Sequence, residues 1–108
     1  MPGYLLIESR DPFESSDVAR TYELAAHLQA AGKEVALFLV QNGVLAVRAG
    51  CSRTGLERLI GTRIEVLADD FSLRERGIST SVLLGGVRSA PIDLIVERMA
   101  AGWNPIWH

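Results

Sequence analysis

The chain has 108 residues, of which 48% are hydrophobic and 22% charged, and its formal net charge is −2 at pH 7. This length suits a single globular domain over residues 1–108, and the abundance of apolar residues argues against a disordered chain. The sequence pI of about 5.6 and the lack of a basic cluster argue against nucleic-acid binding. No apolar run reaches the ~18 residues that cross a bilayer, and the first residues lack the basic stretch of a secretory signal. We therefore expect a cytoplasmic protein that binds neither nucleic acid nor a membrane.

In chain order, the first half of the sequence predicts two strands separated by a helix. The apolar run over 4–7 is typical of a buried strand, and the run over 34–40 is typical of a strand covered on both faces. Between them, residues 15–17 open a helix with apolar residues at every third or fourth position, which a glycine ends. Short helices are expected after the next turn, over 44–48 and 54–60.

The second half repeats this alternation. Residues 63–68 predict a third strand, and the acidic pair that follows caps a helix over 69–76. A fourth strand is expected over 81–84, where two glycines end it, and a last helix is expected to begin at 89–91. Residues 103–108 predict a short edge strand, because a proline within it is poorly tolerated in a central strand.

The alternation predicts an α/β fold, a three-layer sandwich around a mainly parallel sheet of four to five strands. Ligands bind to such a sheet at the carboxyl ends of its strands. The loops that follow the predicted strands are therefore the candidate site, and Asp69 is its candidate catalytic side chain. The candidate binding residues in these loops are Ser9, Asp11, Asn42, Gly43, Asp70, Gly85 and Gly86.

The chemistry of these loops leaves alternatives open. The glycine motifs that bind nucleotides are absent, and acids at two helix starts would repel a phosphate. Only residues 85–89 combine exposed backbone with a cation, Arg88, so this loop is either an anion site or a glycine turn. Asp69 and Asp70 form either a helix cap or a carboxylate pair for acid–base chemistry. We expect neither a metal nor a cofactor.

Cys51 is the single cysteine of the chain and the candidate nucleophile. Alone, it can form neither an intramolecular disulfide nor a cysteine-rich metal site. It is either a small buried hydrophobe or a reactive thiol that the nearby Arg48 and Arg53 favour as thiolate. We expect His27 to be a partly exposed helix residue and His108 to be mobile.

Several apolar side chains exceed what one small domain easily hides: Val44, Leu45, Val47, Trp103, Ile106 and Trp107. Small α/β domains often bury such residues against copies of themselves, which predicts a homo-oligomer. Alternatively, the tryptophans close the core of the monomer.

An ordered set of segments over nearly the whole chain resembles the DsrE/TusD-like (DsrE/F-like) sulfur-relay family. The most specific is Leu-Phe-Leu-Val-Gln-Asn-Gly-Val over 37–44, which is similar to the family's "LFL…(D/N)GV" turn. Residues 4–9, the helix-to-strand join over 24–35, the "RG(I/V)" at 76–78 and the glycines at 85–87 resemble further segments of the family. Their order and spacing carry the resemblance.

This resemblance implies a DsrE-like, flavodoxin-like topology, assembly into trimers or hexamers, and a cytoplasmic role in passing sulfane sulfur to other sulfur-relay proteins. In the sulfur-carrying members, the active cysteine lies eight residues before the glycine of "RG(I/V)", and that position is Asp69 here. A carboxylate cannot hold a persulfide. The resemblance therefore predicts an atypical, sulfurtransferase-like member in which Cys51 is the candidate substitute thiol. The alternative is a small-ligand or partner-binding module without sulfurtransferase activity, whose cleft is formed by Asp11, Asn42, Asp69 and Gly85.

Overall fold

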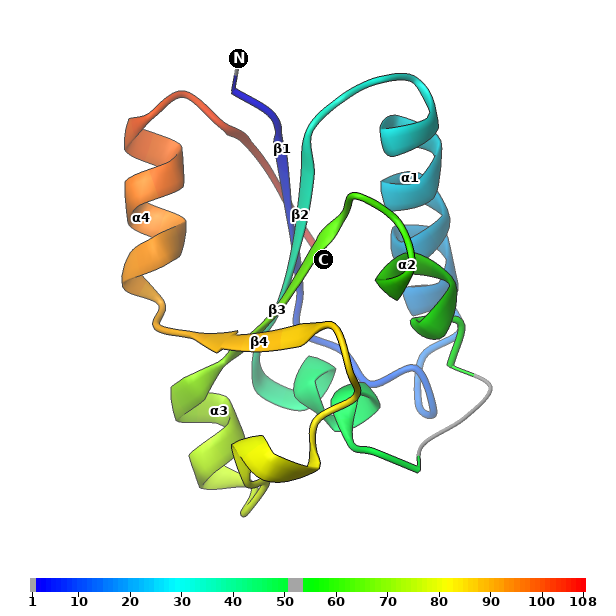
Figure 1. Ribbon diagram of the computed structural model, residues 1–108, viewed down its shortest axis with the longest axis vertical. Helices are drawn as coiled ribbons and strands as arrows, with labels where there is room; N and C mark the ends of the chain where they lie inside the picture. Colours follow the sequence, from blue (N-terminus) through cyan, green and yellow to red (C-terminus); the bar gives the residue numbers. More distant parts are fainter. Residues whose placement is uncertain (1, 51–53) are drawn as a thin grey trace.

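The computed structural model describes residues 2–50 and 54–108, and its five strands form one sheet (Figure 1). The strand order is β4-β3-β2-β1-β5, and every pair of neighbouring strands is parallel. The predicted α/β fold with a parallel sheet is confirmed. Cys51 lies outside the described residues, so both interpretations of it stay predictions.

The three central strands are β1 (Tyr4–Glu8), β2 (Val35–Leu39) and β3 (Glu65–Asp69). β2 is buried at every position, which explains its continuous apolar run, because both of its faces are covered. The edge strands are β4 (Val87–Ala90) and β5 (Asn104–Trp107), and most of their residues are exposed or half-buried. β5 pairs only with β1, so the predicted edge strand is confirmed.

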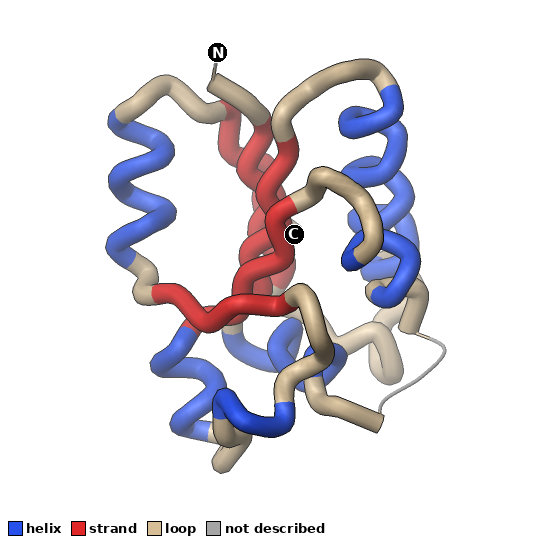
Figure 2. Tube along the Cα trace, viewed as in Figure 1, coloured by secondary structure: helices blue, strands red, loops and turns tan. Residues whose placement is uncertain are grey.

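Helices on both faces of the sheet complete the three layers (Figure 2). α1 (Val18–Ala30) and α2 (Glu57–Ile60) cover one face, and α4 (Asp93–Ala100) covers the other. The 3₁₀ helix η1 (Gln41–Val47) follows β2, and α3 (Asp70–Glu75) follows β3 directly, so both lie at the carboxyl edge of the sheet. A second 3₁₀ helix, η2 (Thr80–Val82), precedes β4. Within the described part of the chain, no helix is long and apolar enough to cross a bilayer.

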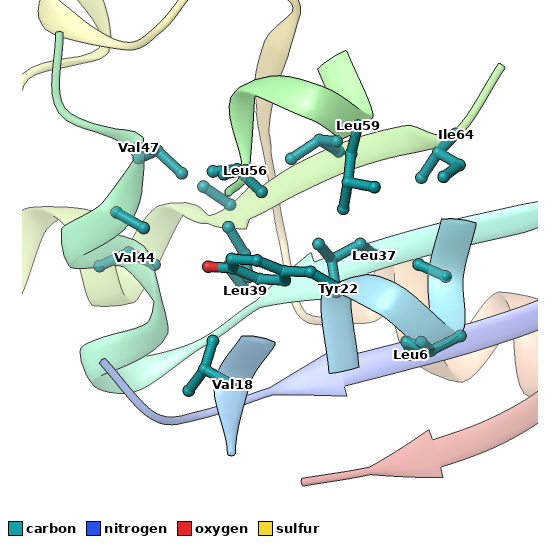
Figure 3. Packing of buried hydrophobic residues seen from close by; sticks show 14 of the residues in the cluster. Leu6, Val18, Tyr22, Leu37, Leu39, Val44, Val47, Leu56, Leu59 and Ile64 are labelled. Carbon is teal, nitrogen blue, oxygen red and sulfur yellow. The ribbon is translucent and has the colours of Figure 1, made fainter. Parts of the chain in front are cut away.

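Each face of the sheet has its own apolar core. On the α1 face, the ring of Tyr22 lies among leucines and valines, and its hydroxyl points toward Val44 and Val47 of η1 (Figure 3). Both valines are fully buried, so they belong to the monomer core rather than to a surface between copies of the chain. On the α4 face, Trp103 is half-buried against the core, whereas Trp107 is 64% exposed.

The predicted position of the fourth strand is wrong. Residues 81–84 do not join the sheet; instead, the Leu84 N–H donates to the Val47 carbonyl at 2.8 Å, and Leu83 forms an isolated bridge with Arg48. The strand is Val87–Ala90, which has no apolar run because it lies at an edge. Gly86, with φ +94°, makes the turn before it, and a Cβ there would collide with the Ile60 side chain.

Because the fourth strand lies later in the chain than predicted, the residues next to it also differ from their predicted positions. Gly85 and Gly86 precede β4 and lie at its amino end, not at the carboxyl edge where the sequence placed them. The last helix starts later than predicted, at Asp93 with Ile92 as N-cap, because residues 89 and 90 belong to β4.

Candidate functional site

A cavity of about 640 Å³ opens at the carboxyl edge of the sheet, where β2, β3, β4 and β5 end. This is the edge at which parallel α/β sheets bind ligands, and the volume is within the range of small-molecule sites. The lining comes from the start of η1, from α3, from the loop after β4 and from β5. It consists of Val40, Gln41, Asn42, Asp69, Asp70, Phe71, Ser72, Glu75, Arg76, Pro91, Ile92, Asp93 and Trp107.

Asp69 is the best-positioned functional group of this cavity. It is the N-cap of α3, and its Oδ2 accepts hydrogen bonds from the Ser72 N–H at 3.0 Å and from the Ser72 hydroxyl at 2.6 Å. The residue is only 5% exposed, and its Oδ1 is buried without a hydrogen-bond partner among the described residues. A buried carboxylate oxygen without a donor is costly and rare in folded proteins. The predicted cap is confirmed, and it uses only one of the two carboxylate oxygens of Asp69.

Ser72 connects this cap to the neighbouring loop. Its hydroxyl donates to Asp69 and accepts from the Gln41 N–H at 2.8 Å. Gln41 is the one described non-glycine residue with a positive φ, 50°, a conformation that costs roughly 1–2 kcal/mol for an L-residue. The hydrogen bond to Ser72 thus holds a strained backbone at the edge of the cavity, a feature frequent at functional sites.

Arg76 is the only described cation in the cavity lining, and all three of its nitrogens have partners. Nε and Nη2 donate to Oδ1 of Asn42 at 3.2 and 3.0 Å, and Nη1 donates to the Ser72 carbonyl at 3.2 Å. The arginine therefore ties η1 to α3. Four acidic side chains share the lining with it: Asp69, Asp70, Glu75 and Asp93.

The structure brings only part of the predicted site together. Asn42, Asp69 and Asp70 line the same cavity. Ser9 and Asp11 line a smaller neighbouring cleft of about 270 Å³, in which Asn42 also takes part. Gly85 and Gly86 line neither.

Gly43 and Arg88 have contacts of their own. Gly43 is buried against β1, where an added Cβ would collide with the Glu8 carbonyl, so the close approach of η1 to β1 requires glycine. Arg88 lies in β4 and pairs with Glu65 at 2.8 Å. Of the two interpretations of residues 85–89, the structure shows the glycine turn, which Gly86 makes, whereas Arg88 is in a strand and carries an acidic partner.

Sequence reasoning missed several residues of this edge. Phe71, Ile92 and Trp107 give the cavity an apolar side, and they come together only because α3, the β4–α4 loop and β5 all lie at this edge of the sheet. A sequence signal did exist for Ser72, because it lies three residues after an N-cap aspartate. No local sequence signal indicates that Glu8 and His108, which are 100 residues apart, lie in contact.

Glu8 and His108 form a close side-chain contact at the end of β1. Glu8 is fully buried at the end of β1, and Nδ1 of His108 lies 2.7 Å from its Oε1. The backbone of His108 also bonds to Ile7 and Ser9. The expectation that His108 is mobile is therefore wrong, since both its backbone and its side chain are anchored. His27 is exposed on α1, in line with its prediction.

Two solved structures share this fold. The ychN protein from E. coli matches with a TM-score of 0.89 at 21% identity, over 100% of both chains. The protein of unknown function MTH1491 from Methanobacterium thermoautotrophicum matches with a TM-score of 0.77 at 24% identity, over 97% of this chain and 96% of that one. No protein-family model matches the chain, and no curated protein matches its sequence. Both comparisons show that the chain shares its arrangement of strands and helices with these proteins over nearly its whole length.

Proposed function

We propose that this chain is an atypical DsrE-like protein of intracellular sulfur transfer or sulfur oxidation, which binds a ligand instead of carrying sulfur. The observation that carries the proposal is Asp69, which caps α3 and belongs to the lining of a cavity of about 640 Å³. By the resemblance, this is the position of the persulfide cysteine in the sulfur-carrying members. A helix start stabilises a carboxylate as it stabilises a thiolate, so the site keeps its electrostatics and changes its chemistry.

The alternative is a binding module with no link to sulfur. Whether the protein carries sulfur as a persulfide is the first property to test. Asp69 cannot form one, so a sulfur-carrying protein would have to use Cys51, the only thiol of the chain.

Intact-mass measurement after incubation with a polysulfide donor tests whether the chain carries sulfur. We expect no stable adduct of one sulfur atom on the wild-type protein. An adduct that is present in the wild type and lost in Cys51→Ser would overturn the non-carrier proposal. The link to sulfur is tested in a strain that lacks the chain, where sulfur oxidation and tRNA thiolation should be measured; unchanged rates of both would favour the alternative.

We further propose that the protein is a cytoplasmic homo-oligomer, a trimer or hexamer. An apolar patch supports this: Ile92, Val96 and Met99 around α4 are each about half or more exposed, and Trp107 is 64% exposed. Monomers seldom leave such a cluster in water. The patch adjoins the cavity, since Ile92 and Trp107 belong to both, so a neighbouring copy would lie close to the ligand.

Light scattering coupled to gel filtration tests the assembly. We expect Val96→Asp to lower the molar mass to that of a monomer. The matched control is Leu24→Asp, which places the same charge at an exposed leucine on α1, in the other helix layer. A wild-type monomer, or equal effects of both substitutions, would contradict the proposed interface.

A further inference from the structure

We propose that His108 accepts a phosphoryl group, which its Nε2 takes from a small phosphoryl donor. The site is a surface cleft of about 330 Å³, lined by Asp17, Arg20, Thr21, Leu24 and His108. None of these residues lines the cavity at the carboxyl edge of the sheet. The inference therefore goes beyond the proposed function and does not depend on it.

The imidazole of His108 is held in one orientation. Its Nδ1 lies 2.7 and 3.0 Å from the two carboxylate oxygens of Glu8, which is 0% exposed. A carboxylate accepts hydrogen bonds and does not donate them, so Nδ1 carries the ring proton. The backbone is fixed as well, because the His108 N–H donates to the Ile7 carbonyl and the His108 carbonyl accepts from the Ser9 N–H and hydroxyl. The contact with Glu8 thus selects the tautomer whose lone pair is on Nε2.

Nε2 of His108 is open to solvent. It has no hydrogen bond to the described residues, and it is not one of their buried unpaired atoms, which are the Tyr22 hydroxyl oxygen and Oδ1 of Asp69. The imidazole side chain is 31% exposed. A carboxylate behind one ring nitrogen and an accessible lone pair on the other is the arrangement that makes a histidine a nucleophile or a base.

The rest of the cleft favours an anionic group at this nitrogen. The guanidinium of Arg20 lies 4.0 Å from Asp17, at the limit of an ion pair, and its side chain is 85% exposed. Arginine binds phosphate oxygens through paired N–H donors, and a phosphoryl group carries up to two charges with which to displace Asp17. The Thr21 hydroxyl, which has no hydrogen-bond partner in the described part of the chain, adds a donor. A cation and a hydroxyl beside the nucleophile match a phosphoryl group better than an uncharged acyl group.

The step is a substitution at phosphorus. The Nε2 lone pair forms the N–P bond, the bond between phosphorus and the leaving group of the donor breaks, and the leaving group departs with its electron pair. No atom is oxidised or reduced. The ring becomes a phosphoimidazolium that keeps its proton on Nδ1, and the Glu8 carboxylate stabilises this positive charge, as a buried carboxylate stabilises an imidazolium in catalytic triads.

Phosphoramidate, whose leaving group is ammonia, is the probe that tests the proposal on the whole wild-type protein. Tryptic peptides separate the two histidines of the chain, since His27 lies in residues 21–33 and His108 in residues 99–108. His27 is exposed on α1 and is thus a reference within the same molecule. We expect His108 to take up one phosphoryl group about tenfold faster than His27 or more. Phosphorus–nitrogen coupling in NMR spectra should place the group on Nε2.

Two pairs of variants test the roles of Glu8 and Arg20. Glu8→Gln should slow phosphorylation of His108 about tenfold or more, because an amide no longer selects one tautomer; Glu97→Gln, at an exposed position of α4, is the matched control. The nitrogen chemical shifts of the ring should show the proton on Nδ1 in the wild type and a mixture of tautomers in Glu8→Gln. Arg20→Gln should slow the reaction with phosphoramidate and leave the reaction with diethyl pyrocarbonate, an uncharged acylating reagent, unchanged. Arg58→Gln, on α2, is the control for this charge.

Several results would overturn the proposal. Equal rates at His108 and His27, or a phosphoryl group on Nδ1, would do so on the wild type alone, even if Glu8→Gln is too unstable to study. Acylation of His108 by diethyl pyrocarbonate without phosphorylation would show an exposed imidazole only. An unchanged rate in a folded Glu8→Gln variant would remove the activation by the carboxylate on which the proposal rests.

Discussion

Removal of the His108 imidazole tests how strongly the buried Glu8 carboxylate depends on it. Glu8 is 0% exposed, its Oε1 lies 2.7 Å from Nδ1 of His108, and its Oε2 accepts from the Arg10 N–H at 2.9 Å. Breaking a buried pair from one side costs about 3–5 kcal/mol, because a charge stays behind without its partner. We expect His108→Ala to lose about 3 kcal/mol, the lower end of this range. The imidazole is 31% exposed and Arg10 still donates, so water and one N–H remain to solvate Glu8.

Urea unfolding at neutral pH measures this loss, and thermal unfolding should show a melting temperature lower by roughly 10 °C. His27→Ala is the matched control, since the same change at an exposed helix position should stay within about 0.5 kcal/mol of the wild type. The double variant Glu8→Gln/His108→Ala should recover part of the loss, because a neutral amide is less costly to bury. Wild-type stability of His108→Ala, or a double variant no more stable than His108→Ala, would refute the reasoning.

Three further predictions concern single side chains. The Tyr22 hydroxyl is buried with no partner among the described residues, and burial raises its pKa well above the usual range. Tyr22→Phe should therefore leave the free energy of unfolding in urea unchanged or raise it by up to about 1 kcal/mol. A loss of about 1 kcal/mol would mean that the hydroxyl is hydrogen-bonded. Ser72→Ala leaves the Gln41 N–H without its acceptor, so it should lower the free energy of unfolding in urea by about 1–3 kcal/mol. An unchanged free energy of unfolding would contradict this role of Ser72. Arg98 holds the pKa of Glu65 below its ordinary value of 4.5 by hydrogen bonds and charge. The pair therefore stabilises the fold above that pH and loses its effect as the pH falls through the lowered pKa. The difference in melting temperature between wild type and Glu65→Gln should be constant near neutrality and shrink in acid, and a difference independent of pH would contradict the pairing.

Much of the fold was predictable because central strands and helix caps have local signals. β2 is covered on both faces, so its burial appears in the sequence as a continuous apolar run. Asp69 was predicted as a helix cap from its residue type and place, and its carboxylate accepts from the Ser72 N–H. The error at β4 has a physical reason as well. Leu83 and Leu84 are apolar because they pack on the core beside η1, whereas the true strand lies at an edge and needs little apolar surface.

The candidate site was predictable only in part, because local signals do not show which distant segments lie together. Asn42 follows β2 and Asp69 ends the adjacent parallel strand β3, so the strand order alone brings them to one edge. Phe71 and Trp107, 36 positions apart, line one cavity only because the parallel sheet brings the ends of β3 and β5 to the same edge. No local pattern could indicate that Trp107 stays exposed while Trp103 packs on the core.

The sequence by itself determined an acidic chain with an α/β fold and a single thiol. It could do so because composition, periodicity and caps depend on near neighbours in the chain. Only the tertiary structure decided that one oxygen of Asp69 lacks a donor among the described residues, that Arg76 ties η1 to α3, and that Glu8 and His108 pair across the whole chain. These properties depend on which partners reach a buried group, and those partners come from distant segments.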